Sequence, residues 1–124
     1  MHIIFLAPHF PANQRNFVRA LKEASLRVAL VVLCGAGGDR FAEAHERDTL
    51  DLLGRLPLED GDLVYLSPFV EWDGSAYAAR ARAEGVQPLD DAAVEAQLER
   101  LRAGVRERHP QVKAARYDIR EFLY

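Results

Sequence analysis

The chain has 124 residues, a length that suits one domain and is too short for two full ones. Hydrophobic residues make up 49% and charged residues 28%, which is ordinary for a globular domain and argues against intrinsic disorder. The formal net charge of −3 gives a phosphate backbone no overall electrostatic support, so we expect no nucleic-acid partner. No apolar run reaches the length of a membrane span, and the first residues lack the basic start of a signal peptide. We therefore expect a cytoplasmic protein that does not associate with membranes.

The first predicted elements are a strand, a helix and a second strand. Residues 3–7 are continuously apolar, as in a strand that is covered on both faces. Asn13 is a good N-cap for a helix whose apolar side chains share one face: Phe17, Leu21 and Ala24. Residues 28–33 form the strongest strand signal in the sequence and end at a glycine-rich turn.

The second half of the chain continues the alternation of helices and strands. A helix is predicted to open near Asp39, and residues 63–66 read as a third strand. A short helix over roughly 75–84 stops at Gly85. A longer one begins at Asp90, and its amphipathic stripe contains Val94, Leu98, Leu101 and Val105. Residues 113–119 complete the series as a last strand.

This alternation predicts a single α/β domain with a four-stranded, mainly parallel sheet in the order βαβαβαβ and helices packed on it. The local signal is the same for an open Rossmann-like sheet and for a partial barrel, so both architectures stay open. In either case a sheet edge is exposed, and pairing of that edge predicts a homodimer.

The turn after the second strand is the strongest candidate for a binding site. Gly35, Gly37 and Gly38 lie at the carboxyl end of that strand, where parallel α/β folds bind their ligands. They permit a close approach of the backbone, and the following helix offers free N–H groups to an anion. Asp39 and Glu43 oppose an anion, however, and a tight turn without a ligand explains the same residues.

Other residues at the carboxyl ends of the strands carry weaker signals. Ser67 and Glu71 follow the third strand and are further candidates for the pocket, whereas Trp72 is either a lid or simple loop packing. His9 has no nucleophile beside it, and we expect a structural or solvent-exposed role. We expect His45 to be a hydrogen-bonded packing residue and Cys34 a small buried hydrophobe. No spacing typical of a metal site is present, and no catalytic set is complete, so activity of the chain alone is not expected.

Residues 1–13 read MHIIFLAPHFPAN, and Phe17 and the stretch ALKEA at 20–24 follow. This opening resembles the start of ATP-grasp ligases of the carbamoyl-phosphate-synthase type, whose first domain is a small Rossmann-like βαβ unit that precedes the ATP-binding subdomains. The resemblance implies an accessory, pre-ATP-grasp role for residues 1–24.

Residues 26–41 read LRVALVVLCGAGGDRF, residues 61–71 read GDLVYLSPFVE and the chain ends in RYDIREFLY. From about residue 21 to residue 124 the chain is similar to the carboxyl-terminal part of the radical SAM barrel, and we treat residues 25–124 as that unit. The resemblance implies contacts of Gly35, Gly37 and Gly38 with the adenosyl group of S-adenosylmethionine, with Ser67 and Glu71 as weaker candidates. The chain has one cysteine, which cannot hold an iron–sulfur cluster.

The two resemblances together lead to three hypotheses. The first is a cluster-free partial barrel that binds S-adenosylmethionine or another nucleotide weakly. The second is a non-catalytic scaffold, such as a chimeric, truncated or engineered chain. The third is an ATP-grasp accessory domain that acts with a separate catalytic chain.

Overall fold

The computed structural model describes residues 2–6, 13–118 and 121, with the backbone alone for residues 2–6, 13–15 and 17. The elements in chain order are β1 (His2–Leu6), α1 (Asn13–Glu23), β2 (Val28–Cys34), α2 (Gly38–Arg55), β3 (Leu63–Pro68), α3 (Ala76–Glu84), α4 (Asp91–Arg108) and β4 (Lys113–Arg116). The chain is a mixed α/β protein, as the alternation predicts. The predicted order βαβαβαβ differs from the observed order, because two helices rather than one connect β3 to β4.

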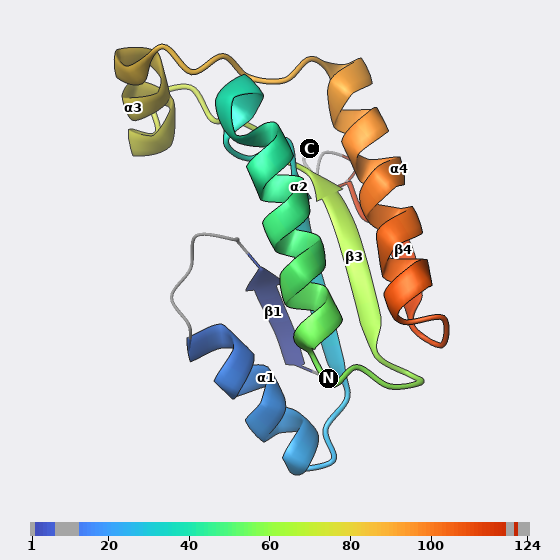
Figure 1. Ribbon diagram of the computed structural model, residues 1–124. Helices are drawn as coiled ribbons and strands as arrows, with labels where there is room; N and C mark the ends of the chain where they lie inside the picture. The colour runs from blue at the N-terminus through green and yellow to red at the C-terminus, as the bar shows by residue number, and fades with distance from the viewer. Residues whose placement is uncertain (1, 7–12, 119–120, 122–124) are drawn as a thin grey trace.

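The sheet is parallel and its strands lie in the order β1-β2-β3-β4. Each strand therefore pairs with the next one along the chain, without the reversal that marks a doubly wound sheet. Right-handed connections between sequential parallel strands place their helices on one face of the sheet. Figure 1 shows this arrangement, with α1, α2 and α4 on the same side of the strands and α3 standing apart at one end.

The core lies between this helical layer and the sheet. Alternate residues of β2 point to the helices, and Val28, Leu30 and Val32 are fully buried there. Val64 and Leu66 of β3 continue the same surface. The helices contribute the large apolar side chains of the cluster, among them Val18, Leu53, Leu98, Leu101 and Val105. The predicted stripe of α4 thus supplies three residues of the core.

Helix α4 begins where its sequence predicts. The Asp90 side chain accepts a hydrogen bond of 2.8 Å from the backbone N–H of Ala93, which satisfies one donor of the first turn. Gly104 sits against Leu50 of α2, and a side chain at this position would collide with that leucine. The glycine therefore lets α4 approach α2 closely.

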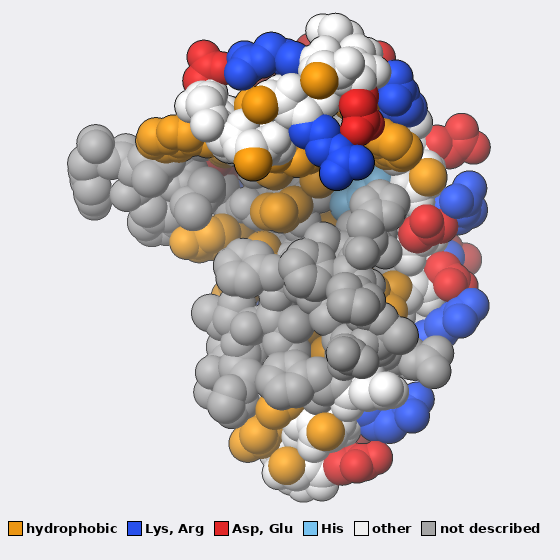
Figure 2. All heavy atoms as spheres, turned by 90° about the vertical axis from the view of Figure 1, so that its left-hand side faces the viewer, with side chains coloured by type: hydrophobic (Ala, Val, Ile, Leu, Met, Phe, Trp, Pro, Cys, Tyr) orange, Lys and Arg blue, Asp and Glu red, His pale blue; other side chains and the backbone are white. Residues whose placement is uncertain are grey.

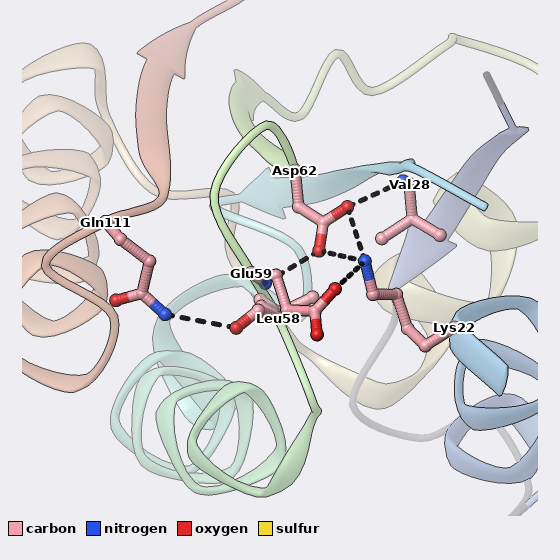
Figure 3. A network of polar contacts seen from close by, with 6 residues as sticks. All are labelled: Lys22, Val28, Leu58, Glu59, Asp62 and Gln111. Atoms are coloured by element: carbon pink, nitrogen blue, oxygen red, sulfur yellow. Dashed lines mark hydrogen bonds and ion pairs between the residues drawn. The ribbon is translucent and has the colours of Figure 1, made fainter. Parts of the chain in front are cut away.

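A buried ion pair closes the end of the domain where the strands begin (Figure 3). The side chain of Asp62 is fully buried and accepts hydrogen bonds from the backbone N–H groups of Val28, at 2.9 Å, and Glu59, at 2.8 Å. Lys22 Nζ lies 2.9 Å from Asp62 Oδ2 and 2.9 Å from Glu59 Oε2. These contacts join the end of α1, the start of β2 and the loop before β3.

The same contacts set the ionisation of the pair. Burial alone would raise the pKa of Asp62, but the hydrogen bonds from Val28, Lys22 and Glu59 outweigh it and lower the pKa of this carboxyl. Burial likewise works to lower the pKa of Lys22, and the carboxylates of Asp62 and Glu59 reverse the effect and raise it. Both groups are therefore charged near neutral pH, and the cluster stabilises the fold.

Candidate functional site

The glycine turn between β2 and α2 depends on backbone conformations that other residues rarely adopt. Gly35, Gly37 and Gly38 have φ angles of 92°, 89° and 59°. A Cβ atom on Gly38 would also collide with the backbone carbonyl of Gln87. The turn thus requires glycine for its shape and for close packing against the segment between α3 and α4.

The backbone N–H groups of this turn are already bonded within the protein. Gly35 donates to Oε1 of the buried Gln97 at 2.7 Å, and Gly37 donates to the Tyr77 hydroxyl at 2.9 Å. The N–H of Gly38 bonds to the carbonyl of Gly35, and that of Asp39 bonds to the carbonyl of Gln87 at 2.9 Å. The N–H groups of Gly35, Gly37 and Asp39 thus donate to residues distant in sequence and that of Gly38 donates within the turn, so these four groups are not free for an anion.

A cavity of about 600 Å³ nevertheless lies beside the turn, within the usual range for small-molecule sites. Its walls are mostly apolar and come from the turn, from α2, from the end of β3 and from α3: Ala36, Gly37, Phe41, His45, Phe69, Tyr77, Arg80, Ala81, Glu84 and Val86. In Figure 2, hydrophobic side chains gather on the side of α3 that faces the rest of the chain. The cavity suits an apolar or aromatic ligand better than a phosphate.

Helix α3 forms one wall of the cavity and is held by a few specific contacts. Its Tyr77 accepts the hydrogen bond from Gly37 and packs edge-on against Phe69, with ring centroids 4.9 Å apart. The Arg40 side chain donates to the backbone carbonyl of Glu84 at 2.6 Å. Phe69 is itself fixed, because its backbone N–H donates to the carbonyl of Cys34 at 2.7 Å.

The two side chains expected to be structural are buried beside the turn. His45 is 2% exposed, and its Nε2 donates to the carbonyl of Leu33 at 2.7 Å, so the prediction of a hydrogen-bonded packing histidine is confirmed. Cys34 is completely buried, as predicted. Burial raises the pKa of the Cys34 thiol to about 12, with a smaller contribution from the charge of Glu95, so the thiol is protonated near neutral pH.

Of the remaining candidates from the sequence, one lines the cavity and the others do not. Gly37 lines the cavity, whereas Gly35 and Gly38 support the turn behind it. Ser67 is buried in β3 and Glu71 is half-buried in the following loop, and neither contributes to the lining. Trp72 is 71% exposed in the same loop. His9 lies outside the described residues.

Sequence reasoning missed three aromatic residues that line the cavity. Phe41 stands one turn into α2, three residues after Gly38, and Phe69 follows β3 at the same end of the sheet. Both positions are at the carboxyl ends of strands, which is the signal that could have identified them. Tyr77 had no such signal, because its place in the site depends on how α3 folds back over the turn.

No protein-family model and no curated protein matches this sequence. The resemblances to radical SAM and ATP-grasp proteins thus rest on the sequence stretches alone. Among the described helices, none combines the length and apolar character that crossing a membrane requires.

Proposed function

We propose that the protein binds a small molecule with a planar aromatic base in the cavity beside the glycine turn, and that the base is the adenine of S-adenosylmethionine or of a related nucleoside. One observation carries this proposal: three aromatic residues, Phe41, Phe69 and Tyr77, line a cavity of about 600 Å³ at the carboxyl ends of the strands. Aromatic walls stack well on planar bases.

Among planar ligands, the fold and the resemblance to radical SAM barrels favour one that carries an adenosyl group. The strands lie in sequential order, which supports a partial barrel rather than a doubly wound sheet. The stretch that is similar to radical SAM barrels includes the glycine turn, and Gly37 of this turn lines the cavity. Since the N–H groups of the turn are bonded elsewhere, recognition through the base fits better than recognition through a phosphate.

Fluorescence of the one tryptophan provides a direct test. Trp72 is 71% exposed in the loop between β3 and the cavity-lining helix α3, so a ligand that orders this region changes its emission. We expect saturable changes with S-adenosylhomocysteine and 5′-methylthioadenosine at dissociation constants below about 1 mM, confirmed by isothermal titration. If neither ligand gives saturable binding, the proposal is wrong and a scaffold without a ligand becomes the better account.

A matched pair of variants ties any binding to the cavity. Ala81 lines the cavity, whereas Ala83 of the same helix is exposed and does not. Ala81→Phe fills part of the cavity and is expected to weaken binding at least tenfold, while Ala83→Phe leaves it unchanged. Equal binding by both variants would place the ligand elsewhere.

A further inference from the structure

The face of α3 that borders the cavity changes in character along the helix. Tyr77, Arg80, Ala81 and Glu84 are spaced i, i+3, i+4 and i+7, so they share one face, and all four line the cavity. Arg80 and Glu84 are the charged residues among the described lining residues. At about 1.5 Å of rise per residue, Arg80 lies about 4.5 Å and Glu84 about 10 Å along the helix axis from Tyr77, so a charged part of the cavity borders the aromatic part near Tyr77.

Glu84 orients the guanidinium of Arg80, and the terminal nitrogens of this guanidinium can donate further hydrogen bonds. Its Nε donates to Glu84 Oε1 at 2.8 Å, which fixes one edge of the planar group. Among the described residues, no hydrogen bond from either terminal nitrogen of Arg80 is present. Those two nitrogens form the edge that matches a carboxylate with two parallel hydrogen bonds. The side chain is 82% exposed, so a ligand can reach it from solvent.

We propose that Arg80 is a specificity-determining residue that binds the carboxylate of the ligand, with Glu84 as the positioning residue that holds its guanidinium. The ligand class is thus a planar aromatic base that carries a carboxylate on a tail long enough to reach Arg80. This inference rests on the proposed function, because it assumes that the ring occupies the aromatic part.

A carboxylate suits this part of the cavity better than a phosphate. The carboxylate of Glu84 stands beside Arg80, and a singly charged group meets less repulsion from it than a doubly charged one. The N–H groups of the glycine turn, which would favour a phosphate, are bonded within the protein.

The test compares three probes that share an adenosyl group. S-Adenosylhomocysteine carries a carboxylate on its tail, 5′-methylthioadenosine lacks it, and adenosine monophosphate carries a phosphate. Each is titrated against the unchanged protein, Arg80→Gln and Arg82→Gln. Arg82 is a matched control, because it lies on the same helix, pairs with Asp73 at 3.1 Å and does not line the cavity.

We expect Arg80→Gln to weaken binding of S-adenosylhomocysteine about tenfold and to leave that of 5′-methylthioadenosine within twofold. Arg82→Gln should change neither, and Arg80→Lys should fall between, since it keeps the charge and loses the paired donors. Equal effects of Arg80→Gln on the binding of both probes, or no effect on either, would overturn the proposed role of Arg80. Binding of 5′-methylthioadenosine to the unchanged protein would still support the proposed ligand site. Tighter binding of adenosine monophosphate than of S-adenosylhomocysteine would overturn the proposal that this part of the cavity binds a carboxylate. If 5′-methylthioadenosine does not bind at all, the proposed function itself fails.

Discussion

The hydroxyl of Tyr77 accepts a hydrogen bond of 2.9 Å from the backbone N–H of Gly37, across forty residues of sequence. The bond attaches α3 to the glycine turn, and both residues line the cavity. The shape of the cavity therefore depends on a contact between two segments that lie outside the sheet and far apart in sequence. This contact is open to solvent, so its strength is modest.

Replacing Tyr77 by phenylalanine removes the acceptor and keeps the ring that packs against Phe69. Because water can replace an exposed acceptor, we expect a loss of about 0.5–1 kcal/mol in the free energy of unfolding and faster hydrogen exchange at the Gly37 amide. Urea denaturation and exchange measured by NMR check the two effects. Tyr65→Phe is the control, since no hydrogen bond of its hydroxyl to a described residue is present. An unchanged exchange rate at Gly37 would show that the bond does not hold the turn.

Gly38 and Gly85 have similar backbone angles, but we expect their replacement by alanine to reduce stability by different amounts. Gly38, with φ of 59°, packs against the Gln87 carbonyl, whereas Gly85, with φ of 68°, has open space around it. Gly38→Ala should destabilise the protein by more than about 2 kcal/mol, because it adds a collision to the backbone strain. Gly85→Ala should lower the free energy of unfolding by only about 1 kcal/mol, from the backbone strain alone. Thermal denaturation of the pair checks this, and equal losses would contradict the packing of Gly38.

The buried carboxyl of Asp62 predicts a dependence of stability on acid. Its pKa in the folded protein lies below the unfolded value of about 3.9, so its contribution is fully present above that pH and is lost as the pH falls through the folded pKa. Asp62→Asn should lose about 3 kcal/mol at neutral pH and show a smaller loss on acidification than the unchanged protein. Asp73→Asn, whose side chain is 95% exposed, should change stability by less than about 0.5 kcal/mol. Urea denaturation between pH 7 and pH 3 measures both, and parallel curves for the Asp62 variant and the unchanged protein would refute the assignment.

The thiol of Cys34 is expected to be inert in the folded protein. Its pKa of about 12 leaves little thiolate near neutral pH, and the side chain has no exposed surface. A disulfide reagent such as dithionitrobenzoate at pH 8 should react fully only in denaturant, and slowly or not at all without it. Rapid reaction of the native protein would mean that this part of the sheet opens readily.

Hydrophobic patterns along the sequence predicted the features that depend on neighbouring residues alone. The apolar run of β2, the stripe of α4 and the burial of Cys34 and His45 all follow from residues within a few positions of one another. Both helices between β3 and β4 were predicted, with Gly85 as the end of the first, but the predicted order βαβαβαβ counted them as a single helix.

The hydrogen bonds of the glycine turn could not be predicted in the same way, since several of their acceptors lie far along the chain. The carbonyl of Gln87, the hydroxyl of Tyr77 and the amide of Gln97 take the hydrogen bonds that a ligand was expected to take. The roles of Gly35, Gly37 and Gly38 in binding stay predictions. So does the homodimer, although the short β4 edge with its exposed Lys113 resembles the edges that proteins protect from pairing.

The position of Asp62 has a consequence for altering the protein. The carboxylate closes the end where the strands begin, and the cavity lies at the other end of strands such as β2, whose seven residues span roughly 20 Å. Substitutions at that separation usually have additive effects on stability. The residues of α3 can accordingly be varied while the anchor at the opposite end keeps the sheet intact, so substitutions in this helix test the proposed ligand preference without loss of the fold.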